Sequence, residues 1–259
     1  MASSVPSYPP SRDLLKDKSV VITAAAGTGI GFATAKRCLE EGAKVMLSDW
    51  HDRRLSQAVD QLNTDGYNAV GVVCDVTKEE DVQGLISSAE EKFGLIDVMV
   101  NNAGLGGDDN LVEMEDEQWN RVLDITLNGT MRCTRAALRH MIGNEAGAIV
   151  NNASVLGWRA QAGQSHYAAA KAGVMALTRC AAIEAAEFGV RVNAVSPSFA
   201  SHPFLEKVSD PKLLKALESQ EAFGRGAEPW EVANVIVFLA SDLSGYMTGE
   251  SLSVSSQRA

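Results

Sequence analysis

The chain has 259 residues, 46% of them hydrophobic and 22% charged, which are ordinary proportions for a globular protein and allow one large α/β domain or two small ones. The formal net charge is −10 and there is no basic stripe, so we expect neither nucleic acid nor an anionic membrane as a partner. No apolar run reaches the roughly 18 residues that a membrane-spanning helix needs, which argues against a membrane protein.

The cysteines and the N-terminus bear on the compartment. The first 12 residues contain three prolines and no apolar core, so they do not form a signal peptide. We expect residues 1–12 to be a flexible tail ahead of the folded domain. The cysteines lack the spacing of metal ligands, so we expect no metal site and interpret them as small buried residues of a reducing compartment, the cytoplasm. They are Cys38, Cys74, Cys133 and Cys180.

Short runs rich in β-branched residues alternate along the chain with longer segments of helical periodicity. The expected strands are 19–23, 44–48, 69–74, 96–100, 148–152, 190–195 and 251–254. The expected helices are 29–41, 55–63, 79–93, 119–142, 165–188 and 229–239. Strands that alternate with helices require right-handed crossovers and a parallel sheet covered on both faces. The sequence therefore predicts an α/β fold over residues 13–259, a single-domain, doubly wound (Rossmann) parallel β-sheet flanked by helices on both faces.

A glycine-rich turn joins the first expected strand to the first helix. Residues 23–31 read Thr-Ala-Ala-Ala-Gly-Thr-Gly-Ile-Gly. In a doubly wound fold this turn presents free backbone N–H groups to a phosphate, and its glycines let the backbone approach a pyrophosphate closely. A tight strand-to-helix turn needs glycine in any case, and that alternative stays open. The candidate cofactor-binding residues of the turn are Gly27, Thr28, Gly29 and Ile30.

Asp49 ends the second expected strand, about twenty residues after the glycines. A carboxylate there can accept hydrogen bonds from the adenosine ribose hydroxyls, and it repels a 2′-phosphate, which favours NAD over NADP. His51, Arg53 and Arg54 follow closely and could soften that preference. Asp49 could instead be a turn residue or the N-cap of the next helix.

Polar and small residues also follow the third and fourth expected strands. Ligands of open α/β sheets collect at such strand ends, where an acid can meet the adenine amino group and small residues can lie against the adenosine. Turn formation explains the same residues equally well. The candidates are Asp75 and Val76 after the third strand, and Asn102, Ala103 and Gly104 after the fourth.

A tyrosine and a lysine four residues apart are the most informative pair in the chain. Tyr167 and Lys171 share one face of the expected helix 165–188. A lysine beside a tyrosine stabilises the phenolate and lowers the phenol's pKa, which gives a general base usable near neutral pH. Taken alone, this spacing is more often a surface pair. Ser154, thirteen residues upstream at the end of an apolar run, joins the glycine turn in favouring a catalytic site.

The order and spacing of these motifs resemble the short-chain dehydrogenase/reductase family, in the shorter of its two main size groups. The likeness covers residues 18–249 and includes the Asn-Ala-Val-Ser-Pro run at 193–197. The resemblance implies hydride transfer between a nicotinamide cofactor, NAD or alternatively NADP, and a secondary alcohol or ketone. It also implies that Tyr167 donates or accepts the proton, that Ser154 polarises the substrate oxygen, and that Lys171 holds the nicotinamide ribose.

The same resemblance assigns the adenosine end. It implies that Asp75 binds the adenine and that Asn102 lies near the adenosine. Pro197 and Ser201 are candidates for the nicotinamide end, although residues 197–202 read Pro-Ser-Phe-Ala-Ser-His where the family usually has Pro-Gly-x-x-x-Thr. Ser201 or His202 then replaces the usual threonine.

Three further departures from the family pattern concern the phosphate loop, the catalytic asparagine and the C-terminus. Ala24 replaces the first glycine of the turn, and one extra residue lies before Gly29. Thr126 stands where the family has a catalytic asparagine, so we count it with the catalytic residues. Asn128 is two residues away, a rotation of about 200° around a helix. The final Val-Ser-Ser-Gln-Arg-Ala also differs from the family's usual Asp-Gly-Gly ending.

The substrate is expected to be bulky and apolar, or a CoA thioester. Trp158, Phe199 and Phe204 favour an apolar pocket, and Arg159 could meet a carboxylate or the phosphates of a thioester. Residues 199–226 are predicted to form a substrate lid. The stretches around Ser154 and Tyr167 are similar to dehydrogenases of bacterial sterol-ring breakdown, which act on hydroxylated hydrindane-propionyl-CoA intermediates.

Two other functions remain open, and the family resemblance also bears on assembly. The chain could be a 3-oxoacyl or acetoacetyl thioester reductase that uses NADPH, or a non-catalytic dinucleotide-binding member of the family. The complete serine, tyrosine and lysine set argues against the last. The long helices 119–142 and 165–188 have wide apolar faces, and the resemblance implies that they pair into a homo-tetramer of D₂ symmetry.

Overall fold

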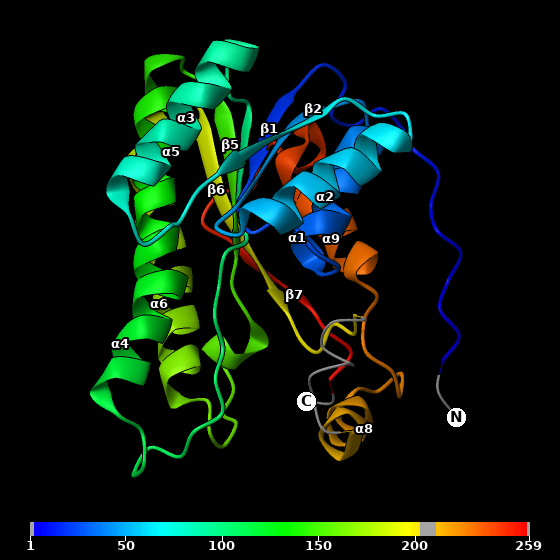
Figure 1. The fold of residues 1–259 in the computed structure, drawn as a ribbon, viewed down its shortest axis with the longest axis vertical. Coiled ribbons are helices and arrows are strands. Elements are labelled where there is room, and N and C mark those ends of the chain that lie inside the picture. Colours follow the sequence, from blue (N-terminus) through cyan, green and yellow to red (C-terminus); the bar gives the residue numbers. More distant parts are fainter. Residues whose placement is uncertain (1–2, 203–210, 258–259) are drawn as a thin grey trace.

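The computed structural model of the chain describes residues 3–202 and 211–257. Within them, seven parallel strands form one sheet in the order β3-β2-β1-β4-β5-β6-β7 (Figure 1). Val20 of the central strand β1 pairs with Val45 of β2 on one side and Val98 of β4 on the other. The strands are β1 (Ser19–Ile22), β2 (Lys44–Asp49), β3 (Ala69–Val73), β4 (Val98–Asn101), β5 (Gly147–Asn152), β6 (Val190–Pro197) and β7 (Ser251–Val254).

Helices cover both faces of the sheet, as the doubly wound prediction requires. In Figure 1, α3, α5 and α6 lie on one side of the sheet and α1, α2 and α9 on the other. Each side has its own cluster of buried apolar side chains. The helices are α1 (Ile30–Glu40), α2 (Asp52–Thr64), α3 (Glu79–Phe93), α4 (Asp116–Leu123), α5 (Gly129–Gly143), α6 (Ser165–Ala185), α8 (Pro211–Gln220) and α9 (Pro229–Ala240).

The burial of the strands explains why short β-branched runs identified them. Every residue of β1 and of β4 is buried, because both strands lie inside the sheet with helices above and below. Such strands are continuously apolar rather than alternating. The edge strand β3 is buried only at Ala69, and its other residues alternate between half-buried and exposed positions. The predicted fold class is therefore confirmed.

The long helix expected over residues 119–142 is wrong in detail. The structure has α4, then a π-helical turn at Asp124–Asn128, then α5. In this turn the Gly129 N–H bonds to the Asp124 carbonyl, five residues back. A π-turn inserts one residue into a helix and shifts the faces that follow it. Helical periodicity in the sequence does not reveal such an insertion. Within the expected lid, residues 203–210, including Phe204, lie outside the described residues.

The N-terminal segment makes contacts that we did not expect of a flexible tail. The Arg37 guanidinium of α1 donates hydrogen bonds to the carbonyls of Pro9 (3.0 Å) and Pro10 (3.1 Å). The buried Glu41 carboxylate pairs with the same guanidinium and accepts a hydrogen bond from the Arg12 N–H at 2.9 Å. A buried ion pair is retained when its remaining donors and acceptors find partners. Here those partners are backbone groups of the segment, which runs down one edge of the molecule in Figure 1.

We predict that Gly31→Ala destabilises the protein by about 1–3 kcal/mol, the usual cost of overpacking. A Cβ at Gly31 would lie inside van der Waals distance of the Ala24 carbonyl oxygen and 2.5 Å from Asn102 Nδ2. Urea unfolding measures the change. Gly84→Ala in α3 is the matched control, because its Cβ would meet nothing within 4 Å and alanine favours a helix. Equal stability of the two variants would contradict the close approach at Gly31.

Candidate active site

The candidate residues gather at the carboxyl ends of the central strands. The strand order reverses between β1 and β4, because the chain builds outward from β1 first toward β3 and then toward β7. Open α/β sheets bind ligands in the crevice at such a reversal. The turns after β1, β2, β4 and β5 all open onto this edge. The structure thus brings together residues that are more than a hundred positions apart in the sequence.

Ser154 and Tyr167 come from adjoining elements, the end of β5 and the first turn of α6. Ser154 caps the 3₁₀ turn Val155–Gly157, and its Oγ accepts a hydrogen bond from the Leu156 N–H at 3.2 Å. The Ser154 hydroxyl is also near enough to the Tyr167 phenol to lower its pKa. Ser154 is 8% exposed, whereas Tyr167 is half-buried, so its hydroxyl can meet a ligand.

Lys171 lies one helical turn after Tyr167 and is only 3% exposed. Its Nζ donates a hydrogen bond to the Asn152 carbonyl and lies 5.5 Å from the centroid of the Tyr167 ring. Among the described residues the ammonium has no other hydrogen-bond acceptor. A Cβ built on Gly104 would lie 3.3 Å from Nζ and 3.8 Å from Thr126 Oγ1, so Gly104 separates these two polar groups.

The pKa values of this pair correct one expectation. Burial lowers the pKa of Lys171 to about 7. Burial also raises the pKa of Tyr167 to about 12, against a lowering contribution from the Ser154 hydrogen bond. We expected the lysine to lower the phenol pKa. In the protein without ligands, desolvation dominates instead, and a lysine with a pKa of about 7 carries only part of its charge at neutral pH.

Thr126 and Asn128 occupy opposite sides of the π-turn. The Thr126 hydroxyl is buried, accepts a hydrogen bond from the Leu105 N–H at 2.9 Å and donates one to the Leu105 carbonyl at 3.1 Å. Asn128 is exposed and donates to the Asp124 carboxylate at 3.2 Å. The single hydroxyl proton of Thr126 is therefore used in fixing the loop after β4. This use of the hydroxyl differs from the catalytic role that the sequence analysis gives to Thr126.

Two pairs of asparagines, which the sequence analysis did not single out as a unit, connect the strand ends. Asn101 Nδ2 donates to Asn151 Oδ1 at 2.8 Å, and Asn152 Nδ2 donates to Asn102 Oδ1 at 2.9 Å. Asn102 Nδ2 in turn donates to the Ala24 carbonyl of the glycine turn at 3.0 Å. The sequence did carry a signal for this network: Asn-Asn-Ala occurs at the ends of both β4 and β5.

The glycine turn is open at Gly27, while the His202 ring lies beside Gly29. Gly27 has φ +107° and open space around it, and α1 begins without a side-chain N-cap, so its first N–H groups remain available. Thr28 lies nearby, with Oγ1 3.4 Å from His202 Nδ1. Ala24, which replaces the family's first glycine, has a left-handed φ of 49°. That conformation is uncommon for alanine, and the substitution therefore leaves some backbone strain in the turn. Gly29 and Ile30 complete the turn and begin α1.

Asp49 and Asp75 differ in the hydrogen bonds that their carboxylate oxygens already accept within the protein. Asp49 is 5% exposed, and its Oδ1 accepts a hydrogen bond from the His51 N–H at 2.9 Å. Its Oδ2 accepts none from the residues that the structure describes, so it can receive a ribose hydroxyl. Asp75 Oδ1 accepts from both the N–H and the hydroxyl of Thr77, at 3.0 and 2.8 Å. Asp75 therefore also serves the turn before α3, while the next residue, Val76, is buried.

The remaining candidates lie around the edges of the crevice. The Ala103 N–H donates to the Thr23 hydroxyl at 3.1 Å, which ties the turn after β4 to the turn after β1. Pro197 is buried at the end of β6, opposite Val254 of β7. The Ser201 N–H donates to the Ala227 carbonyl at 3.0 Å, so these two residues lie side by side although they are 26 positions apart in the sequence.

These groups fit a dinucleotide. The open N–H groups of α1 suit its phosphates, Asp49 Oδ2 suits one ribose, and the uncommitted Lys171 N–H groups suit another. Over the ranges that the structure describes, no three His, Cys, Asp or Glu side chains are placed to hold a metal ion. Within the same ranges, no helix combines the length and hydropathy that crossing a membrane requires.

Comparison with known proteins identifies the family. A family model described as Enoyl-(Acyl carrier protein) reductase matches residues 24–256. A crystal structure of a short chain dehydrogenase from Mycobacterium smegmatis has the same fold, with a TM-score of 0.88 and 59% identity over 99% of each chain. The chain belongs to the short-chain dehydrogenase/reductase family. The resemblance inferred from the motifs is therefore confirmed.

Two curated relatives within this family show its chemistry. A protein of Mycobacterium tuberculosis named (5R,7aS)-5-hydroxy-7a-methyl-1-oxo-2,3,5,6,7,7a-hexahydro-1H-indene-carboxyl-CoA reductase is 61% identical over 94% of each chain. The 3-oxoacyl-(acyl-carrier-protein) reductase FabG of Thermotoga maritima is 39% identical, over 93% of this chain and 97% of the relative. This short-chain dehydrogenase/reductase is an oxidoreductase acting on CH–OH groups, and its cofactor is a nicotinamide dinucleotide.

We predict that Lys171 makes the stability of the free enzyme rise with pH between 7 and about 10. The folded-state pKa of about 7 lies below the ordinary 10.5, so the unfolded chain binds the proton more tightly throughout this window. Stability is therefore lost as the pH falls through the window and regained as it rises. The free energy of unfolding in urea should be measured for wild type and Lys171→Met across this window. The difference between the two proteins should change by up to about 1.4 kcal/mol for each pH unit. A constant difference across the window would contradict the lowered pKa.

Proposed function

We propose that this enzyme is an NAD-dependent dehydrogenase or ketoreductase that interconverts a secondary alcohol and a ketone on a bulky CoA thioester, such as a hydroxylated sterol-ring fragment. The observation that carries the proposal is the buried Lys171 beside Tyr167 and Ser154, in a chain 61% identical to a hydrindane-type carboxyl-CoA reductase. The site supports the reaction type, and the relative's name supports the substrate.

The nicotinamide ring, when bound, gives or takes the hydride at the substrate carbon. Ser154 donates a hydrogen bond to the substrate oxygen and so stabilises charge that develops on it. Tyr167 donates the proton to that oxygen in reduction and removes it in oxidation. Lys171 holds a cofactor ribose through the N–H groups that it does not give to Asn152, and Thr126 acts as a positioning residue that fixes the loop after β4.

The substrate side of the crevice supports a large, partly apolar molecule. Trp158 is 54% exposed beside the Ser154 turn, and Phe223 is 54% exposed beyond α8. Exposed aromatic side chains at the edge of a polar site are suited to an apolar ring system. The Phe199 ring packs against Gly226, where a Cβ would approach to 2.8 Å. We propose that residues 199–226 form the lid over this side.

NAD is the proposed cofactor rather than NADP. Asp49 is buried at the end of β2 with one oxygen still free to accept a hydrogen bond, and a 2′-phosphate would lie against this negative charge. Arg54 Nη2 lies 3.5 Å from Asp49 Oδ1, the other carboxylate oxygen, and reduces the repulsion of a 2′-phosphate only in part. Its charge is already paired with Asp49, and its side chain is 41% exposed to solvent. Of the remaining cofactor candidates, Asp75, Val76 and Asn102 to Gly104 would face the adenosine half, and Pro197 and Ser201 the nicotinamide half.

A second candidate function is reduction of 3-oxoacyl or acetoacetyl thioesters with NADPH. The 39% identity to a 3-oxoacyl-(acyl-carrier-protein) reductase favours it. Steady-state rates separate the two candidates: a hydrindanone CoA thioester with NADH should react at least tenfold faster than acetoacetyl-CoA with NADPH, a difference of about 1.4 kcal/mol. The reverse order would favour the second candidate. Absence of any nicotinamide oxidation over a broad ketone panel would instead favour a non-catalytic dinucleotide-binding protein.

We also propose a homo-tetramer in the cytoplasm. The exposed Ile183 of α6 supports burial of that helix against another subunit, since it is 80% exposed in the single chain. Pairing of helix faces about two two-fold axes gives D₂ symmetry. The unpaired thiols support a reducing compartment: Cys38, Cys74 and Cys133 are buried, and Cys180 is exposed.

Tyr167→Phe should lower kcat at least about 100-fold, because it removes only the hydroxyl that transfers the proton. Binding of the dinucleotide, measured by fluorescence titration, should stay within twofold of wild type, since Lys171 and Asp49 remain. Ser154→Ala is a companion variant with the same expected pattern. Retention of a substantial fraction of wild-type kcat by Tyr167→Phe would remove Tyr167 from the mechanism.

Asp49→Ala should narrow the preference for NAD over NADP about tenfold, the loss of roughly 1.4 kcal/mol of discrimination. The ratio of kcat/KM for the two cofactors measures the effect. Asp75→Ala serves as the control, because that carboxylate lies one strand farther along and is engaged with Thr77. Tighter binding of NADP than NAD by the wild type would overturn the role given to Asp49.

A further inference from the structure

Arg159 lies at the end of the turn that carries Ser154. The turn is compact, because the Gly157 N–H donates to the Ser154 carbonyl at 2.9 Å and the Arg159 N–H donates to the Val155 carbonyl at 3.0 Å. Arg159 and its neighbour Trp158 are exposed. This position suits the part of a large substrate that lies outside the reacting ring.

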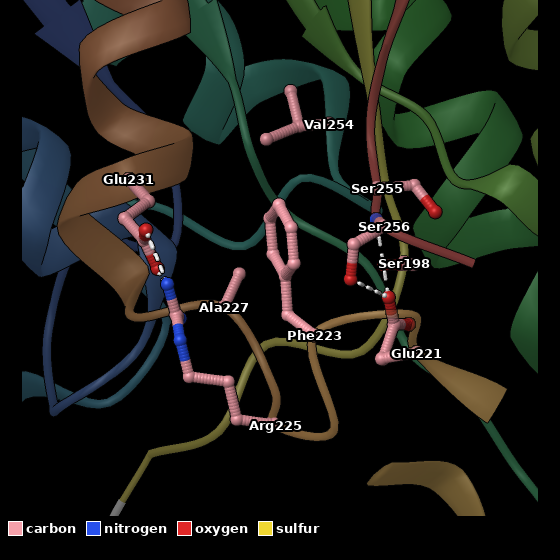
Figure 2. A pocket seen from close by; sticks show the side chains of 9 residues that line it. All are labelled: Ser198, Glu221, Phe223, Arg225, Ala227, Glu231, Val254, Ser255 and Ser256. Atoms are coloured by element: carbon pink, nitrogen blue, oxygen red, sulfur yellow. Dashed lines mark hydrogen bonds and ion pairs between the residues drawn. The ribbon is translucent and has the colours of Figure 1, made fainter. Parts of the chain in front are cut away.

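Among the described residues, the guanidinium of Arg159 is held by a neutral group. Arg159 Nη1 donates a hydrogen bond to the side-chain oxygen of Gln257, a neutral acceptor. In the part of the chain that the structure describes, no carboxylate forms an ion pair with Arg159. Arg225, by contrast, makes a bidentate pair with Glu231 at 2.6 and 2.9 Å, drawn in Figure 2.

The backbone that carries this amide is fixed by a buried carboxylate. Glu221 is 3% exposed, and its Oε2 accepts hydrogen bonds from the N–H (3.1 Å) and the hydroxyl (2.8 Å) of Ser256, as Figure 2 shows. Glu221 also forms an antiparallel bridge with Gln257, whose N–H donates to the Ser255 hydroxyl at 3.0 Å. A guanidinium held in this way loses less conformational freedom when it binds an anion.

We propose that Arg159 binds an anionic group of the substrate, and that Gln257 is the residue that positions it. The group is a phosphate of the CoA portion or the carboxylate of the free acid, since each can offer two oxygens to the planar guanidinium. The proposal rests on the proposed function and adds to it the residue that binds the charged end of the substrate. It also gives a role to the C-terminal residues that differ from the usual family ending.

The test compares Arg159→Gln with wild type on three forms of one hydrindanone substrate: the CoA thioester, the free acid and the neutral methyl ester. Removing the charge should raise KM about tenfold for the form whose anion Arg159 binds, with kcat unchanged. A rise for the thioester alone identifies the phosphates, and a rise for the free acid identifies the carboxylate. KM for the methyl ester should stay within twofold.

Three further measurements make the test specific. Arg159→Lys, which keeps the charge but not the bidentate fork, should recover part of the KM loss. Gln257→Ala should raise KM for the same anionic form by a smaller factor, since the charge remains but is no longer held. Raising NaCl should increase KM for that form in wild type and much less in Arg159→Gln. Arg135→Gln is the matched control, because that arginine is also exposed but pairs with Glu79, away from the crevice.

An equal change in KM for all three forms, or no change for any, would overturn the role of Arg159. Failure of the proposed function has a different signature: the wild type would leave all three hydrindanones unreduced and reduce acetoacetyl-CoA. In that case the test of Arg159 uses two other substrates in place of the hydrindanones: acetoacetyl-CoA, which is charged, and ethyl acetoacetate, which is neutral. Arg159→Gln should then raise KM for acetoacetyl-CoA alone, and an equal effect on both would again overturn the proposal.

Discussion

The buried ammonium of Lys171 is the constraint on which the rest of the site depends. Burial lowers its pKa to about 7, and each pKa unit corresponds to about 1.4 kcal/mol against the charged form. The Asn152 carbonyl gives it one acceptor, and the rest of its hydrogen-bonding capacity stays open in the crevice. A charged group in this state gains most from a ligand that brings hydroxyl groups. In the role proposed for Lys171, a ribose with its hydroxyl groups would be such a ligand.

The surrounding polar network holds that lysine in one place. The asparagines at the ends of β4 and β5 bond to each other, and Asn102 continues the network to the glycine turn after β1. Thr126 fixes the loop after β4 from the other side, through a π-turn that directs its hydroxyl inward. Buried polar networks specify one arrangement when their members are satisfied, because each broken bond leaves a desolvated group. These side-chain hydrogen bonds thereby tie together the turns after β1, β4 and β5.

The substrate side is organised by a different principle. There the buried acid Glu221 fixes backbone, because its carboxylate accepts a hydrogen bond from the Ser256 N–H. Through Ser256 and Gln257 this acid connects the segment after α8 to the turn that carries Ser154. In the role proposed for Arg159, this short, hydrogen-bonded path would fix the distance between the reacting oxygen and the charged end of the substrate.

The sequence alone determined the alternation of strands and helices, the glycine turn, and Ser154, Tyr167 and Lys171, because each depends on local periodicity or on the spacing of a motif. Tertiary structure alone decided what these residues experience. The π-turn at Asp124–Asn128, the contacts of residues 3–12 with Arg37 and the high pKa of Tyr167 arise from packing between distant segments. The desolvation of an ionisable side chain depends on all the residues that surround it in the fold, whereas a sequence motif gives only the side chain itself. A tyrosine and a lysine one helical turn apart thus predicted a catalytic pair, while the sign of their pKa shifts depended on the burial that the fold imposes.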